Sequence, residues 1–176
     1  VSPAGGDPVT VEVASGRVVA RGLSMPHSPR LYRGALYLLD SGHGRLVRCD
    51  PASGTVETIT ELPGFTRGLD CFAGHAFVGL SRIRETAVFG GLPIGRDPAA
   101  LRCGVAVVDL STGRCVGSFW FLDGVEEVFA TLSLPGWRNP ALIGPETSSD
   151  DNPAIWLVPE QSPASAPGRM ASISSA

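Results

Sequence analysis

The chain has 176 residues, enough for one domain with a buried core. Hydrophobic residues account for 43% of it and charged residues for 18%, which predicts a folded rather than a disordered chain. The net charge of −3 at pH 7 gives no electrostatic basis for binding nucleic acid or an anionic membrane surface. No apolar run approaches the ~20 residues of a membrane span, and no secretory pattern opens the chain, so we expect a cytoplasmic protein.

Short apolar or alternating runs bounded by turn residues recur along the chain and predict β-strands. Helical periodicity is weak, and only residues 98–102 indicate a single helical turn. The stretch GLSMPHSPRLY, residues 22–32, holds His27 between Pro26 and Pro29. Because prolines fix φ and restrict the preceding residue, we predict neither helix nor regular strand there. The predicted strands are 9–14, 16–20, 35–40, 44–50, 55–62, 75–81, 104–110, 115–121 and 154–159.

Three turns recur between these strands. The segments ASGRVV, ASGTVE and STGRCV place Gly16, Gly54 and Gly113 in the same kind of hairpin turn. Asp50 and Asp109 precede two of the turns and are suited to initiating them.

A second marker follows each turn, at Gly22, Gly64 and Gly124, with spacings of 42 and 60 residues. A period near 40 with about four short strands is typical of a β-propeller blade. We therefore predict an all-β fold, a β-propeller of four-stranded blades present as a partial ring, about three to four blades of an expected six. Residues 1–160 would form this ring, and the Ser/Ala/Pro-rich residues 161–176 a disordered tail.

The second unit is longer because of an insertion at residues 82–102, which is rich in glycine and proline. Long surface insertions are thermodynamically cheap, so it is explained equally well as a tolerated loop or as a functional one.

The four cysteines are widely spaced and form no C-x-x-C pair, which indicates free thiols in a reducing compartment. They are Cys49, Cys71, Cys103 and Cys115. The chain begins at Val1 inside a strand-like region, without an initiator methionine, so we interpret it as a fragment of a longer protein.

Unusual residues gather on one face of the predicted blades. In an up-and-down blade, the connector entering the first strand and the connector joining the second to the third lie on the same side. These connectors carry the residues that we select as ligand-binding candidates: His27, Arg67, Asp70, Arg82, Arg84, Glu85, Glu126 and Glu127. The connectors of the opposite face, such as 50–55 and 109–114, are generic short turns.

Several long motifs resemble an uncharacterised family of bacterial β-propeller proteins. They are GLSMPHSPRLYRGALYLLDSGHGRL, LPGFTRGLDCFAGHAFVGLSRIRE, FGGLP and CGVAVVDLSTG, and the resemblance covers residues 10–145. It implies a propeller with further blades before this segment, and no known function. After Ile143 the sequence departs from the family's pattern, which leaves the last blade and the closure of the ring open. Since a partial ring leaves blade faces uncovered, we expect remaining blades or self-association to cover them.

The first functional hypothesis is a binding module for a small ligand or a protein segment, with no cofactor. Arg67 and Asp70, with Arg82, Arg84 and Glu85 of the insertion, make a mixed-charge rim suited to a peptide or a small anion. The alternative for each charge is an ion pair within the chain, such as Arg67 with Glu126 or Glu85.

The second hypothesis is a metal-dependent hydrolase or lactonase of the six-bladed type, with a divalent metal. Such a site needs oxygen and imidazole ligands that converge on an activated water, here His27, Asp70, Glu126 and Glu127. These enzymes use Glu, Asn and Asp of successive inner strands, and the asparagines, Asn139 and Asn152, lie in loops. No nucleophile elbow, P-loop or dinucleotide fingerprint is present.

The three histidines receive different predictions. His75 follows a short turn and is expected to be solvated, whereas His43 lies between two glycines and is expected to bond to backbone in a tight turn. Only His27 is predicted to be functional. Phe129 is predicted to lie in a strand and to pack between blades, and Trp137 to be exposed.

Overall fold

The computed structural model describes residues 9–82 and 92–138. The chain divides into two compact units, Val1–Ser133 and Leu134–Ala176. All the regular secondary structure described belongs to the first unit. Within the described ranges, no helix is long and apolar enough to cross a membrane.

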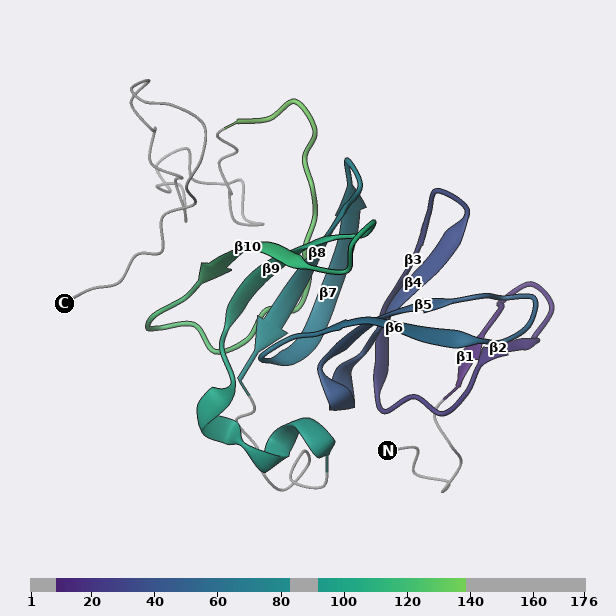
Figure 1. The fold of residues 1–176 in the computed structure, drawn as a ribbon, viewed down its shortest axis with the longest axis horizontal. Coiled ribbons are helices and arrows are strands. Elements are labelled where there is room, and N and C mark those ends of the chain that lie inside the picture. Colours follow the sequence, from purple (N-terminus) through teal and green to yellow (C-terminus); the bar gives the residue numbers. More distant parts are fainter. Residues whose placement is uncertain (1–8, 83–91, 139–176) are drawn as a thin grey trace, which may run out of the picture. The chain divides into compact units, whose positions relative to one another are not determined.

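Two four-stranded antiparallel sheets dominate the first unit, and in each the strands follow one another in chain order (Figure 1). One sheet contains β3 (Pro26–Tyr32), β4 (Ala35–Asp40), β5 (Arg45–Cys49) and β6 (Val56–Glu61). The other contains β7 (Phe65–Phe72), β8 (His75–Ser81), β9 (Gly104–Asp109) and β10 (Cys115–Trp120). A hairpin of β1 (Thr10–Val11) and β2 (Val18–Ala20) precedes them, and the short 3-10 turns are η1 (Ser41–His43), η2 (Pro93–Arg96) and η3 (Pro98–Ala100).

The all-β prediction is confirmed for the described residues. Each of the predicted strands between residues 9 and 121 contains one observed strand, namely β1, β2, β4, β5, β6, β8, β9 or β10. The predicted strand at 154–159 lies outside the described residues. The helical turn predicted at 98–102 is observed as η3.

The two remaining strands, β3 and β7, were not among the predicted strands, and β3 corrects the prediction for residues 22–32. That stretch does contain a strand, because β3 lies at the edge of its sheet, where a proline without an N–H group is tolerated. In β3 the pairing passes from His27–Leu39 to Arg30–Tyr37, so Ser28 and Pro29 form a bulge.

A bulge recurs in β7 one residue further from the following turn, where Arg67 and Gly68 are the extra residues. Ser28 and Gly68 both have positive φ, 52° and 80°. The amide of Gly68 donates to Ser28 Oγ at 3.1 Å, which ties the bulge of one sheet to the bulge of the other.

The three predicted turns share one hydrogen-bond pattern. The amide of the acidic residue that starts each turn donates to the carbonyl five residues later at 2.9 Å. The glycine amide donates back to the acidic residue's carbonyl at 2.8 Å, and the glycine φ lies between 70° and 74°. The prediction for these turns is confirmed; their first residues are Glu12, Asp50 and Asp109, and their glycines Gly16, Gly54 and Gly113. Hydrogen bonds within the turns lower the pKa of the Asp50 and Asp109 carboxyls.

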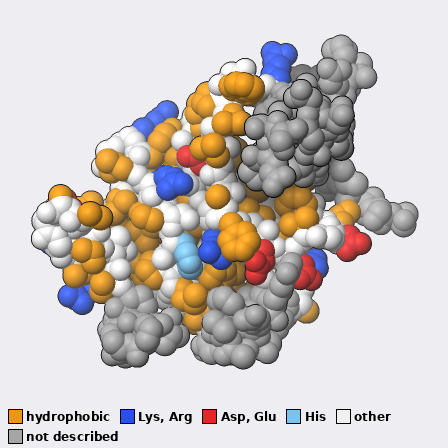
Figure 2. All heavy atoms as spheres, turned by 180° about the vertical axis from the view of Figure 1, so that it is seen from behind, with side chains coloured by type: hydrophobic (Ala, Val, Ile, Leu, Met, Phe, Trp, Pro, Cys, Tyr) orange, Lys and Arg blue, Asp and Glu red, His pale blue; other side chains and the backbone are white. Residues whose placement is uncertain are grey.

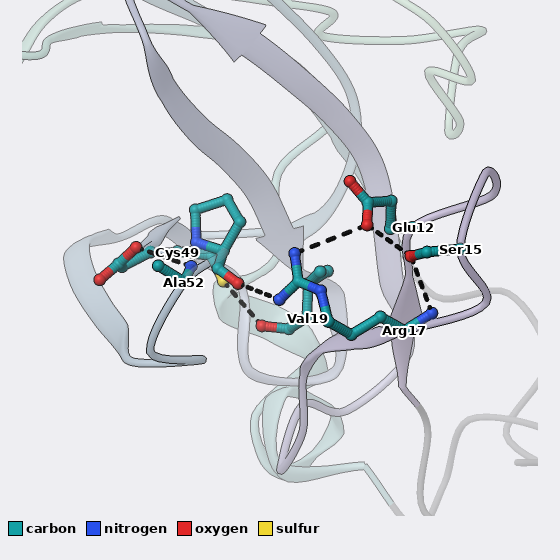
Figure 3. Close-up of polar contacts among 8 residues, drawn as sticks. Glu12, Ser15, Arg17, Val19, Cys49 and Ala52 are labelled. Carbon is teal, nitrogen blue, oxygen red and sulfur yellow. Dashed lines mark hydrogen bonds and ion pairs between the residues drawn. The ribbon is translucent and has the colours of Figure 1, made fainter.

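Polar contacts attach the β1–β2 hairpin to the turn after β5 (Figure 3). Arg17 donates to the carbonyl of Pro51 at 2.5 Å, and the Cys49 thiol donates to the carbonyl of Val19 at 3.3 Å. Within the hairpin, Glu12 accepts a hydrogen bond from Ser15 and lies 3.6 Å from the Arg17 guanidinium. The thiol of Cys49 is free, as are the other three, so the prediction of unpaired cysteines agrees with the structure.

One hydrophobic core serves both large sheets. Leu39 and Leu46 of the first sheet and Leu69, Val78 and Leu80 of the second are fully buried in the same cluster. Side chains alternate across a strand, so this shared cluster holds the inner faces of the two sheets together. A smaller cluster around Leu38 and Val47 fills the other face of the first sheet.

Residues 124–133 run along one face of the second sheet without joining a ladder. The amide of Val128 donates to Ser81 Oγ at 2.9 Å, and Thr131 Oγ1 donates to the carbonyl of Phe77 at 3.0 Å. Gly68 permits this close approach, because a Cβ there would lie 2.6 Å from Ala130 Cα. The segment therefore packs backbone to backbone on the sheet.

Candidate functional site

His27 is held at the start of β3 by two acceptors. Its Nδ1 lies 2.8 Å from the carbonyl of Met25 and 2.9 Å from Ser41 Oγ. Ser41 is fully buried at the start of η1, and its hydroxyl donates to the carbonyl of Thr66 at 2.6 Å. The imidazole is thus linked through one hydroxyl to the beginning of β7.

This arrangement determines the tautomer of His27. A carbonyl oxygen only accepts, and the single proton of the Ser41 hydroxyl is already donated to Thr66. The proton between the imidazole and these two partners must therefore reside on Nδ1. In the neutral ring, Nε2 is then an acceptor; it makes no hydrogen bond in the described part of the chain and is not buried.

Arg67 and His27 each lie six residues before a two-residue turn of positive φ, but Arg67 belongs to the β7 bulge whereas His27 pairs with Leu39 before the β3 bulge. Its guanidinium carbon lies 4.3 Å from the centroid of the Phe129 ring, a cation–π geometry. Arg67 is half-buried and forms no ion pair with any carboxylate among the described residues. The pairing with Glu126 offered as an alternative is therefore not formed, and Glu85 lies outside the described residues.

Phe129 corrects another prediction. It lies outside any strand, and 58% of its surface is exposed. One face of the ring carries the Arg67 guanidinium, and the exposed remainder borders the same site. The position of Phe129 follows from the way residues 124–133 lie on the second sheet.

Asp70 takes a structural position instead of facing a ligand. Its Oδ2 accepts a hydrogen bond from the amide of Ser133 at 2.6 Å. Burial acts to raise the pKa of Asp70, but the hydrogen bonds from Ser133 and the Cys71 amide, with the charge of Arg30, outweigh burial and lower it. The carboxylate thus fastens residues 124–133 to β7.

The other predicted residues separate into two groups. Arg82, Glu126 and Glu127 are exposed, and the amide of Arg82 donates to the carbonyl of Glu126 at 2.8 Å. Arg84 and Glu85 lie outside the described residues. Among the described candidates, Arg82 and Glu126 thus meet through their backbones, while the charge of Arg67 acts on the His27 ring.

A family model described as a domain of unknown function, DUF4915, matches residues 3–143. The chain belongs to this family. No curated protein matches the sequence.

In this DUF4915 domain, sequence reasoning missed the role of Ser41 and of the pair Asp40–His43. Asp40 is buried, and its Oδ1 accepts a hydrogen bond from the Ser24 amide at 2.7 Å. His43 Nδ1 lies 2.8 Å from Asp40 Oδ2 but makes no hydrogen bond among the described residues. His43 therefore lies beside a carboxylate instead of making the predicted bond to the backbone. In the sequence, the signal for this pair was an aspartate, Asp40, three residues before His43.

The DUF4915 domain shows no group of three or more His, Cys, Asp or Glu side chains that could hold a metal ion, within the described residues. Asp70 is engaged by the Ser133 amide, while Glu126 and Glu127 are exposed. The convergence required by the hydrolase hypothesis is therefore not observed among these residues.

An open depression of about 310 Å³ lies between the two sheets near the turn that follows β9. Its charged lining is Arg48 and Glu57, which form an ion pair at 2.7 Å. Because these charges neutralise one another, the depression offers a charged ligand less than the His27–Arg67 site does.

The protonation of His27 has a consequence for stability. Burial lowers the pKa of His27, the charge of Arg67 lowers it further, and the hydrogen bond to Met25 does not offset them. In the unfolded chain the imidazole binds a proton near its ordinary pKa of about 6.5. The unfolded state then binds more protons, so the free energy of unfolding must fall as the pH drops through this value.

We expect the free energy of unfolding to decrease between about pH 7.5 and about pH 5.5, and a His27→Gln variant to show a smaller decrease. Urea denaturation at both pH values measures it. His75→Gln, at the half-buried first residue of β8, serves as the control and should retain the wild-type dependence. An unchanged pH dependence in His27→Gln would contradict the assignment.

Proposed function

We propose that this chain is part of a β-propeller and that it binds a small organic anion at His27 and Arg67, without a cofactor. The observation that carries the proposal is the Arg67 guanidinium, which is half-buried, rests on Phe129 and has no carboxylate partner among the described residues. A cation held in this way, beside an imidazole whose pKa burial lowers, lacks a counter-charge in the described part of the chain.

A propeller arrangement would support this site, because equivalent positions of successive blades come together in a propeller. His27, Arg67 and Phe129 each lie six residues before the first residue of a turn, at Arg33, Ala73 and Pro135. The hydrogen bond between Gly68 and Ser28 joins β3 and β7, which would be the first strands of successive blades. In a propeller the first strands of neighbouring blades surround the channel, so these side chains would form a row at its mouth.

The anion is expected to be small and to carry a carboxylate or a phosphate. The planar guanidinium donates two parallel hydrogen bonds to either group. Phe129 holds the guanidinium in place by its ring face, so little side-chain freedom is lost when the anion binds.

Binding of propionate and of inorganic phosphate tests the proposal, followed by NMR shifts of the arginine side-chain N–H groups. We expect saturable shifts at Arg67 and affinity at least about tenfold weaker in Arg67→Gln, the loss of one charge-assisted contact. Arg114→Gln, at an exposed arginine in the turn after β9, is the matched control and should bind as the wild type does. Equal affinities in Arg67→Gln and the wild type would refute the site.

A further inference from the structure

We propose that the ligand of this site is a hydroxycarboxylic acid, whose carboxylate binds Arg67 and whose neighbouring hydroxyl donates to Nε2 of His27. This inference rests on the proposed function, because it names the ligand class of the same site. It follows from which atoms of the site donate and which accept.

His27 offers the ligand a hydrogen-bond acceptor. Met25 and Ser41 hold the ring proton on Nδ1, so Nε2 presents a lone pair. That atom has no partner in the part of the chain that the structure describes and is not buried. A ligand atom that meets it must therefore be a donor, such as a hydroxyl, and a carboxylate oxygen there would be repelled.

Arg67 offers the ligand hydrogen-bond donors. Its guanidinium presents N–H groups, and no described carboxylate uses them. The two residues lie on neighbouring strands, because the Gly68–Ser28 hydrogen bond joins β3 and β7 directly after His27 and Arg67. A ligand that satisfies both residues has an anionic acceptor beside a neutral donor.

An aromatic side chain, Phe129, borders the site. The exposed part of the Phe129 ring lies next to the guanidinium that the ring supports. Phe65 makes an edge contact with the His27 ring, with centroids 5.8 Å apart. Phe65 itself is buried, so the exposed part of the Phe129 ring is the surface that the carbon skeleton of a small hydroxy acid can cover and an inorganic anion leaves uncovered.

Lactate and propionate provide the test, because they differ by one hydroxyl group. We expect the protein to bind lactate about fivefold more tightly than propionate, the contribution of one neutral hydrogen bond. In His27→Phe this preference should fall to about one, whereas Arg67→Gln should weaken both anions alike. His75→Gln should leave the preference unchanged.

The outcomes separate this inference from the proposed function. Equal, saturable binding of both anions by the wild type would overturn the hydroxy-acid assignment and leave the anion site standing, whereas binding of neither would overturn both. A preference that persists in His27→Phe would also overturn the assignment. Should that variant not fold, the ¹⁵N signal of Nε2 in the wild type decides, because lactate must shift it and propionate must not.

Discussion

Replacing Gly68 with alanine is expected to destabilise the domain by about 3–5 kcal/mol, the combined effect of backbone strain and overpacking. Gly68 has a φ of 80°, which alanine adopts with strain. A Cβ at this position would also lie 2.6 Å from Ala130 Cα and 2.8 Å from the nitrogen of Thr131. Because both neighbours are backbone, relief requires residues 124–133 to move away from the second sheet. Urea denaturation measures the loss.

Gly22→Ala is the matched control for Gly68→Ala. Gly22 has a similar φ of 73°, but a Cβ there would meet nothing within 4 Å. Its replacement should introduce only the strain of a left-handed alanine, about 1–2 kcal/mol. Equal losses in the two variants would show that the contact with Ala130 does not stabilise the fold.

Replacing Leu69 with alanine is expected to cost about 3–5 kcal/mol and to loosen both large sheets. Leu69 is fully buried in a cluster that includes Leu39 and Leu46 of the first sheet and Val78 of the second. Removing its side chain leaves a cavity on which both sheets border, so amide hydrogen exchange should accelerate in β4 and β5 as well as in β8.

Leu31→Ala supplies the comparison for Leu69→Ala. Leu31 lies in β3 and is 76% exposed, so its truncation should change the free energy of unfolding by less than about 0.5 kcal/mol. Exchange that accelerates only in β7 and β8 of Leu69→Ala would show that the sheets do not depend on a common core.

The local features of this protein follow from short stretches of its sequence. Alternating apolar runs predicted eight of the ten strands described, because the period of two along a half-buried strand is visible in one segment. The turns at Gly16, Gly54 and Gly113 were equally predictable, since an acidic or polar start and a glycine of positive φ are local requirements. None of these features depends on residues far along the chain.

The tertiary structure alone decided the two bulged strands and the site that they carry. Pro26, Pro29 and Gly68 obscure the strand pattern, and edge position and bulging make β3 and β7 tolerate them. The tautomer of His27 depends on Ser41, 14 residues away, and on the bond of Ser41 to Thr66, 25 residues further. Such contacts arise only when separate strands pack together, because no local pattern encodes which distant hydroxyl will face an imidazole.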